Sequence, residues 1–240
     1  MVQIKTITDN FITKRYLQFS RKPFSSLSFK SGIAGYLTLI GFVLISQWSG
    51  NKIHFFTEET NRFLTTQIKF LFGVVVLNII GFICFDTLKL KKYMVLVSYI
   101  SGMLFPFCLL AFLACTTKNP IKNTIYGSLI LFTGWIIGVI VHILLVKLSL
   151  KKGTMKIRDM YGDYFTNISS GLGMISLFYG FARDEDVFLQ VGFLLIMVAL
   201  LIVGTFNFPR ILPYWRKEQS KKDISVYSDS IKLMKRGKSK

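Results

Sequence analysis

Residues 164–182 read YFTNISSGLGMISLFYGFA, and they form the least regular of six apolar blocks in a chain of 240 residues. The block contains four Asn and Ser residues and three glycines, so hydropathy alone leaves open whether it crosses a membrane. The other five blocks are more uniformly apolar. Most are about twenty residues long, the length that spans roughly 30 Å of hydrocarbon. The number of crossings therefore depends on residues 164–182.

The five regular blocks are rich in Ile, Leu, Val and Phe, and nearly all charged residues lie between them. They cover residues 33–48, 68–85, 93–115, 125–146 and 187–208. A core helix of a soluble protein would show a polar stripe instead. The sequence thus predicts an all-α integral membrane protein with a transmembrane domain over residues 33–208.

The positions of Lys and Arg indicate that residues 164–182 are a sixth span. With six spans, 24 cations lie on one side of the membrane and six on the other. Cytosolic segments are enriched in Lys and Arg, and without this span the ten cations that follow residue 208 would lie outside. We therefore expect six transmembrane helices with both termini in the cytosol.

The net charge of +18 has the same explanation. The cytosolic side carries +17 of it, in a basic N-terminal segment (residues 1–32), the cytosolic loops and a basic tail (residues 209–240). This charge predicts contact with the anionic inner leaflet of the bilayer rather than with nucleic acid. Residues 11–19, FITKRYLQF, predict a short helix on the inner membrane surface.

The cytosolic connection before the fifth span predicts an amphipathic helix. Its apolar residues follow the spacing i, i+3, i+4, i+7, i+8, and its charged residues lie elsewhere on the helical wheel. These apolar residues are Ile157, Met160, Tyr161, Tyr164 and Phe165. Two roles are open for this face: contact with lipid, or docking of a cytosolic partner.

Small residues predict close helix packing in the fourth and fifth spans. In the fourth span, one face within about 80° carries three glycines and a histidine at spacings of seven, four and four. The packing candidates are Gly127, Gly134, Gly138 and His142 in the fourth span, and Ser169, Gly173, Ser176 and Gly180 in the fifth. Packing within one molecule is the simpler interpretation, and a dimer interface is the alternative.

Three residues are candidates for chemistry. Cys84, Asp86 and His142 are all expected near the cytosolic ends of their spans, and a Cys/His pair oriented by an acid is a nucleophilic arrangement. In residue type alone this resembles membrane-embedded cysteine peptidases that process signalling peptides. No local His-to-Cys motif accompanies it, and structural roles for all three are the alternative. No motif for a metal, a nucleotide or another cofactor is present in the sequence.

Three functional classes follow. Since no Lys, Arg, Asp or Glu lies near the centre of any span, we expect an interaction protein rather than an ion-coupled transporter. Self-immunity proteins against a bacteriocin or a secreted membrane-active toxin often have this build, and the partner would be a membrane-active peptide or another membrane protein. The alternatives are a transporter subunit that docks a separate ATPase, and the Cys-His peptidase. The excess of Lys over Arg, 22 to 8, suggests a bacterial plasma membrane.

Overall fold

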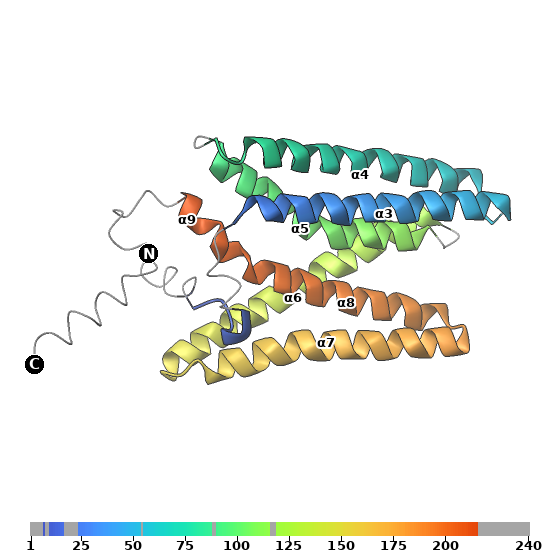
Figure 1. Ribbon diagram of the computed structural model, residues 1–240. Helices are drawn as coiled ribbons and strands as arrows, with labels where there is room; N and C mark the ends of the chain where they lie inside the picture. Colours follow the sequence, from blue (N-terminus) through green and yellow to red (C-terminus); the bar gives the residue numbers. More distant parts are fainter. Residues whose placement is uncertain are drawn as a thin grey trace, which may run out of the picture.

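The computed structural model describes residues 7, 10–16, 24–53, 55–87, 90–115 and 119–215, without the side chains of Tyr161 and Pro213. Within these residues the regular secondary structure is helical (Figure 1). The long helices are α3 (Ser26–Lys52), α4 (Glu58–Cys84), α5 (Lys91–Ala114), α6 (Pro120–Lys151), α7 (Lys156–Arg183) and α8 (Asp186–Phe206). A short 3-10 helix η1 (Phe208–Arg210) and α9 (Leu212–Trp215) follow.

Local sequence explains where several of these helices begin and end. The side chain of Thr57 accepts a hydrogen bond from the Thr60 backbone N–H, which caps α4. Pro120 begins α6, where its fixed φ suits a helix and no backbone N–H is needed. Gly153 and Asp184 have positive φ in the turns after α6 and α7, and both residue types tolerate this conformation.

Consecutive long helices run in opposite directions, so the bundle has two ends (Figure 1). We call the end where α3, α5 and α7 begin the Arg158 end, and the end where α4, α6 and α8 begin the Asp186 end. The described N-terminal residues and α9 both lie at the Arg158 end (Figure 1). The predicted amphipathic helix and the block of residues 164–182 form one continuous helix, α7.

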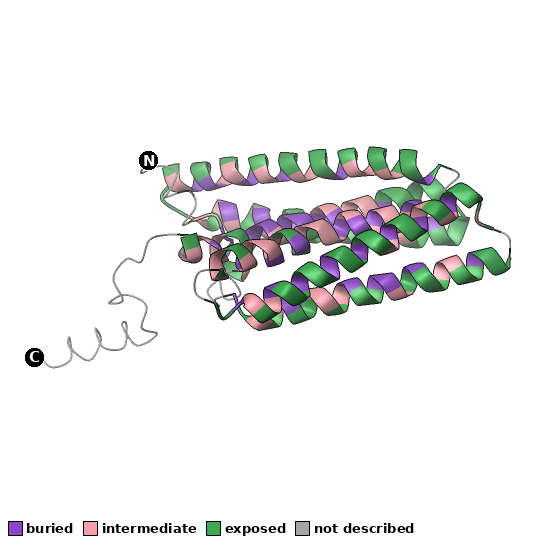
Figure 2. Ribbon diagram, turned by 90° about the horizontal axis from the view of Figure 1, so that it is seen from above, coloured by how far each residue is buried: buried purple, intermediate pink, exposed green. Residues whose placement is uncertain are grey.

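Five helical segments are long and apolar enough to cross a membrane: α3, α4, α5, α6 and Asp186–Arg210. Large apolar side chains, such as Phe72, Ile83 and Ile137, are exposed on these segments. Exposed residues lie along the outer faces of the helices (Figure 2). This is the surface expected of a protein surrounded by lipid. The chain is therefore an all-helical, multi-pass protein suited to a membrane, although α7 is not among the five segments.

Helices α3, α4 and α5 share a core that combines apolar packing with hydrogen bonds. Leu64, Leu71 and Val43 are fully buried in it. The Asn78 side chain donates to the Ser101 hydroxyl over 2.8 Å, and the Tyr36 hydroxyl donates to the Ser101 carbonyl over 2.6 Å. Because lipid is as apolar as leucine, such interhelical hydrogen bonds and close packing hold helices together in a membrane.

Helices α7 and α8 lie side by side along most of their length (Figure 1). A Cβ added to Gly173 would lie 2.8 Å from the carbonyl oxygen of Gly192, so the two backbones touch at this point. The Ser176 hydroxyl donates to the Phe188 carbonyl over 2.7 Å. Helix α6 joins this pair through Trp135, whose indole N–H donates to the Thr205 hydroxyl over 2.8 Å.

Candidate functional site

A cavity of about 1000 Å³ lies at the Asp186 end, between α5, α6 and α8. Its walls are largely apolar and include Leu113, Ile130, Leu189 and Phe193. The segment 55–57 and the end of α7 complete its lining. This volume is at the upper end of the range for ligand sites in proteins. We call this cavity the Asp186 pocket.

The path of α6 explains why the pocket exists. Helix α6 crosses the bundle diagonally and lies close to α7 at the Arg158 end only (Figure 1). There the Ser149 hydroxyl accepts a hydrogen bond from the Arg158 backbone N–H over 2.9 Å. Towards the Asp186 end α6 diverges from α7 and α8, and the pocket occupies the space between them.

Polar groups are few in the pocket and come from several elements. They include Thr57 and Thr60 near the start of α4, Asn123 on α6, and Asp186 and Gln190 on α8. Among the described residues that line the pocket, Asp186 alone carries a formal charge. A mostly apolar cavity with a small number of placed polar groups is typical of a site that binds an organic ligand.

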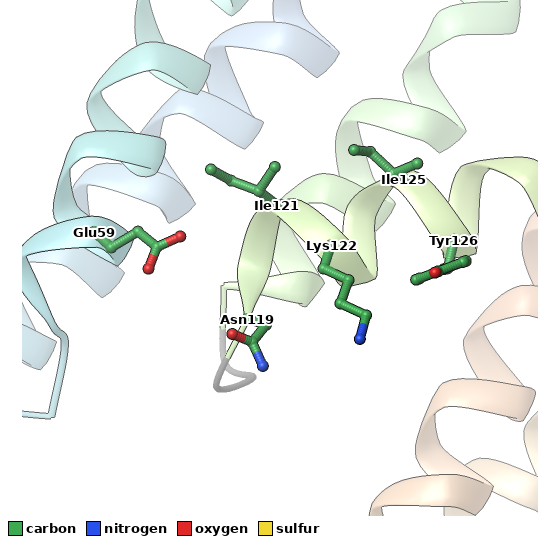
Figure 3. A pocket seen from close by; sticks show the side chains of 6 residues that line it. All are labelled: Glu59, Asn119, Ile121, Lys122, Ile125 and Tyr126. Carbon is green, nitrogen blue, oxygen red and sulfur yellow. The ribbon is translucent and has the colours of Figure 1, made fainter.

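A second, smaller pocket of about 370 Å³ lies on the other side of the first turns of α6 (Figure 3). Glu59 reaches it from α4, whereas Ile121, Lys122 and Tyr126 belong to α6. Tyr126 lines both pockets. The smaller pocket carries one acid and one base, so it has no net charge to select a charged ligand.

The Arg158 end holds a different polar cluster, which is built around residues 10–16. The Thr13 hydroxyl donates to Asp163 Oδ1 over 2.9 Å, and the Lys14 backbone N–H donates to Asp159 Oδ1 over 2.9 Å. The Arg158 guanidinium donates to the Asn10 carbonyl over 2.8 Å and also pairs with Asp159. We call residues 10–16 the N-terminal clasp.

The clasp is packed against protein. The side chains of Ile12 and Thr13 are 7% and 0% exposed. The Phe11 ring packs edge-on against Phe206 of α8 at a centroid distance of 6.0 Å. Within the short helix that we expected over residues 11–19, residues 14–16 are helical, and residues 17–19 lie outside the described residues.

The three candidates for chemistry lie in different surroundings. His142 is 4% exposed, and its ring contacts the Phe11 carbonyl and the rings of Phe11 and Phe206. Cys84 is the last residue of α4, and Asp86 follows it in an exposed turn. The contacts of His142 are therefore made with the clasp and α8. Within the described residues, no group of three His, Cys, Asp or Glu side chains is placed to hold a metal ion.

The small residues of α6 face two neighbours. A Cβ on Gly127 would lie 3.0 Å from Leu110 of α5, and one on Gly134 would lie 3.2 Å from Val198 of α8. Gly138 faces the Cδ1 end of the Ile202 side chain of α8, which would have to shift to admit a Cβ. His142, one turn further, faces Gly162 of α7.

The small residues of α7 face α8 in the same molecule. Gly173 and Gly180 are buried where the backbone of α8 passes, and Ser176 bonds to Phe188. Ser169 is 9% exposed on the same side. These contacts belong to packing within one molecule, which was the simpler of our two interpretations.

The predicted amphipathic face is divided by the structure. Ile157 is half-buried, whereas Met160, Tyr164 and Phe165 are exposed at 36%, 54% and 39%. The Phe165 ring also approaches Gly138 of α6. The side chain of Tyr161 lies outside the described part of the structure. Met160 and Tyr164 thus form an exposed apolar pair at the Arg158 end.

Sequence reasoning missed the clasp and the Asp186 pocket. A signal for the clasp existed: Thr13 and Lys14 precede the first span, and the connection before the fifth span carries Asp159 and Asp163 on the same side of the membrane. The pocket had no comparable signal, because its lining comes from five separate parts of the chain. Comparison with known proteins adds no assignment: no family model, no curated protein and no solved structure matches this chain.

Proposed function

We propose that this protein is a non-enzymatic membrane protein that binds an amphipathic ligand in the Asp186 pocket and so protects its own cell against a secreted, membrane-active toxin such as a bacteriocin. The observation that carries the proposal is the cavity of about 1000 Å³, apolar over most of its lining and with a few polar side chains among its lining residues. A toxin segment that enters the outer half of the bilayer has this chemistry. Its capture there would keep it from assembling in the membrane.

The proposal includes six crossings of the plasma membrane, with both termini in the cytosol. Helix α7 supports the sixth crossing, since it exposes Ile168, Leu172 and Ile175 and turns its small polar residues toward α8. Its 28 residues extend about 42 Å, enough to cross the hydrocarbon layer beside α8. With this topology the Asp186 pocket opens on the outer side, where a secreted toxin arrives.

The proposed inner side is the Arg158 end. The excess of Lys and Arg on that side suits the anionic leaflet of a bacterial plasma membrane. The tail, residues 216–240, lies outside the described residues. We propose no role in nucleic-acid binding, since the membrane surface accounts for the charge.

The surroundings of His142 support a non-enzymatic role. A nucleophilic cysteine needs a histidine nitrogen within hydrogen-bond reach. The Nε2 atom of His142 contacts the Phe11 carbonyl, 2.6 Å away, and among the described residues no hydrogen bond joins the imidazole to Cys84. A Cys84→Ala, His142→Ala double variant with unchanged protection would agree with binding as the function, and loss of protection by Cys84→Ala alone would contradict it.

Protection can be tested together with the pocket. Deletion of the gene should make its cell more sensitive to a membrane-active toxin encoded beside it, and the wild-type gene should restore resistance. Ile130→Trp fills the pocket from α6 and should not restore it. Ile137→Trp is the matched control, because Ile137 lies two turns further along α6 with similar exposure, 56% against 58%, and does not line the pocket.

The two variants separate the possible results. Resistance with Ile137→Trp but not with Ile130→Trp supports binding in the pocket. Equal resistance with both variants would remove the pocket from the function. Unchanged sensitivity after deletion of the gene would end the immunity proposal.

A second candidate function is that of a membrane subunit that docks a cytosolic ATPase of a transporter. The exposure of Met160 and Tyr164 at the Arg158 end favours it, because an exposed apolar pair on a helix can seat a partner. Met160→Asp with Tyr164→Asp should then remove an ATPase that copurifies with the wild-type protein. An unchanged set of copurifying proteins would exclude docking through this face.

A further inference from the structure

We propose that the Asp186 pocket selects peptides that carry an ammonium group on an apolar body, with the ammonium at Asp186 and the apolar side chains along α8. This inference rests on the proposed function and names the chemistry of its ligand. The protein would thereby recognise a cationic membrane-active peptide by its N-terminal amine or by a lysine.

One face of α8 leads from the carboxylate into the pocket. Asp186, Leu189, Gln190, Phe193 and Leu194 all line it. Their spacing is i, i+3, i+4, i+7, i+8, which places them on the same side of a helix. From Asp186 to Leu194 this face extends about 12 Å. A ligand on it would therefore meet one charge first and apolar side chains afterwards.

The charge of Asp186 is available to a ligand. Its side chain is exposed, and no ion pair with another described residue accounts for it. Asp186 begins α8, where a carboxylate also favours the helix dipole. That effect explains an acid in the first turn. It does not explain why this carboxylate, the single formal charge among the described lining residues, lies in the wall of the pocket.

Aromatic side chains in the pocket add to the preference for a cation. Phe55, Phe56, Tyr126, Phe181 and Phe193 all line it. The faces of aromatic rings attract ammonium groups, and the attraction increases when water is excluded. An anionic head group would meet the Asp186 carboxylate and these rings, and both interactions are unfavourable for an anion.

The remaining polar groups favour a peptide over a lipid amine. The side-chain amides of Asn123 and Gln190 and the hydroxyls of Thr57 and Thr60 come from three helices and one loop. The Thr57 and Thr60 hydroxyls bond to each other over 3.0 Å. The Gln190 amide, on the same face of α8 as Asp186, can pair with the N–H and C=O groups of a peptide backbone, whereas an alkyl chain has no groups to pair with it.

A pair of tripeptides tests the inference. The probes are Leu-Leu-Phe-amide, which has a free ammonium, and its N-acetyl derivative, which has the same apolar body without the charge. Binding to the full-length protein in phosphatidylcholine nanodiscs is measured by calorimetry, with empty nanodiscs as the blank. We expect the free amine to bind at least tenfold more tightly than the acetylated peptide.

Variants at the adjacent acids Asp186 and Glu185 test which of them causes the tighter binding of the free-amine peptide. Asp186→Asn should abolish the tenfold preference and leave the weaker binding of the acetylated peptide unchanged. Glu185→Gln removes the same charge one residue earlier, outside the pocket lining, and should keep the preference. Equal loss in both variants would overturn the role of Asp186, because it would indicate a general effect of charge at this end.

The other outcomes distinguish this inference from the proposed function. Equal binding of both peptides, lost in Ile130→Trp, would overturn the ammonium inference and leave the pocket as a ligand site. Absence of binding by either peptide would count against the pocket itself. Displacement of the free amine when phosphatidylethanolamine is added to the nanodiscs would overturn the assignment to a peptide and identify a lipid amine instead.

Discussion

The imidazole Nε2 of His142 lies 2.6 Å from the carbonyl oxygen of Phe11, and the two rings meet edge-on at a centroid distance of 4.8 Å. The residues are 131 positions apart, so this contact ties the start of the chain to α6. A carbonyl oxygen can only accept, and Nε2 must therefore carry the proton that is donated. His142 thus positions the clasp through both its hydrogen bond and its ring.

Arg158→Met should loosen the clasp. Arg158 is 6% exposed, and its guanidinium bonds to the Asn10 carbonyl and pairs with the Asp159 carboxylate. This carboxylate also accepts a hydrogen bond from the Lys14 backbone N–H. Hydrogen bonds to charged groups contribute about 1.5–3 kcal/mol, so the released population should rise at least tenfold. Trypsin cleavage after Lys14 and Arg15, followed by mass spectrometry in nanodiscs, measures it.

Lys156→Met is the control for this experiment, since Lys156 is exposed two residues earlier and has no part in the clasp contacts described above. Its cleavage rate should match that of the wild type. If Arg158→Met also matched the wild type, the clasp would not depend on this guanidinium.

Thr13 and Asp163 should be energetically coupled. Their hydrogen bond of 2.9 Å is made by the hydroxyl of the fully buried Thr13, so removal of Asp163 leaves this hydroxyl without its partner. A double-mutant cycle with Thr13→Val and Asp163→Ala, read from the same cleavage rates, should give a coupling of about 1 kcal/mol. Purely additive effects would show that the bond does not hold the clasp.

Arg15 and Asn167 provide the comparison for that cycle. They form a side-chain hydrogen bond of the same length, 2.9 Å, but the bond is exposed to solvent. Water competes for both groups when they are exposed, so their coupling should be clearly smaller than that of Thr13 and Asp163.

The long helices could be predicted from the sequence because hydrophobic length is a local property. All but the last residue of the apolar block at residues 68–85 lies within α4, and the block at residues 125–146 lies within α6. Helices α3, α4 and α6 begin several residues before their blocks, since helical hydrogen bonding continues where the chain leaves the apolar layer. The amphipathic segment and residues 164–182 form one helix, α7, because the helical periodicity continues from one into the other.

The clasp and the pocket could not be predicted in the same way, because both depend on contacts distant in sequence. Nothing near Phe11 indicates that its carbonyl meets His142, and nothing near Asp186 indicates a cavity against Ile130. Both arise from the diagonal path of α6, which brings it to α7 at one end and away from α7 and α8 at the other (Figure 1). The path of α6 places Gly134 and Gly138 against Val198 and Ile202 of α8.

Gly173→Leu should destabilise the pair of α7 and α8. A side chain at this position meets the backbone carbonyl of Gly192, which cannot move aside without bending α8. Overpacking of a tight contact costs about 1–3 kcal/mol, and a lower melting temperature in detergent should report it. Gly171→Leu, two residues earlier, has open space around its Cβ and should melt like the wild type. Equal melting of the two variants would contradict the close approach.

The turn between α7 and α8 should lie outside the cell, and labelling of single cysteines tests this. In a background with Cys84, Cys108 and Cys115 replaced by alanine, Glu185→Cys should react with a membrane-impermeant maleimide in intact cells. Lys152→Cys, in the turn between α6 and α7, should react only after lysis. Both positions are exposed, so access and not burial decides the result. If Glu185→Cys also required lysis, the turn between α7 and α8 would not lie outside the cell, and the proposed outward opening of the Asp186 pocket would be wrong.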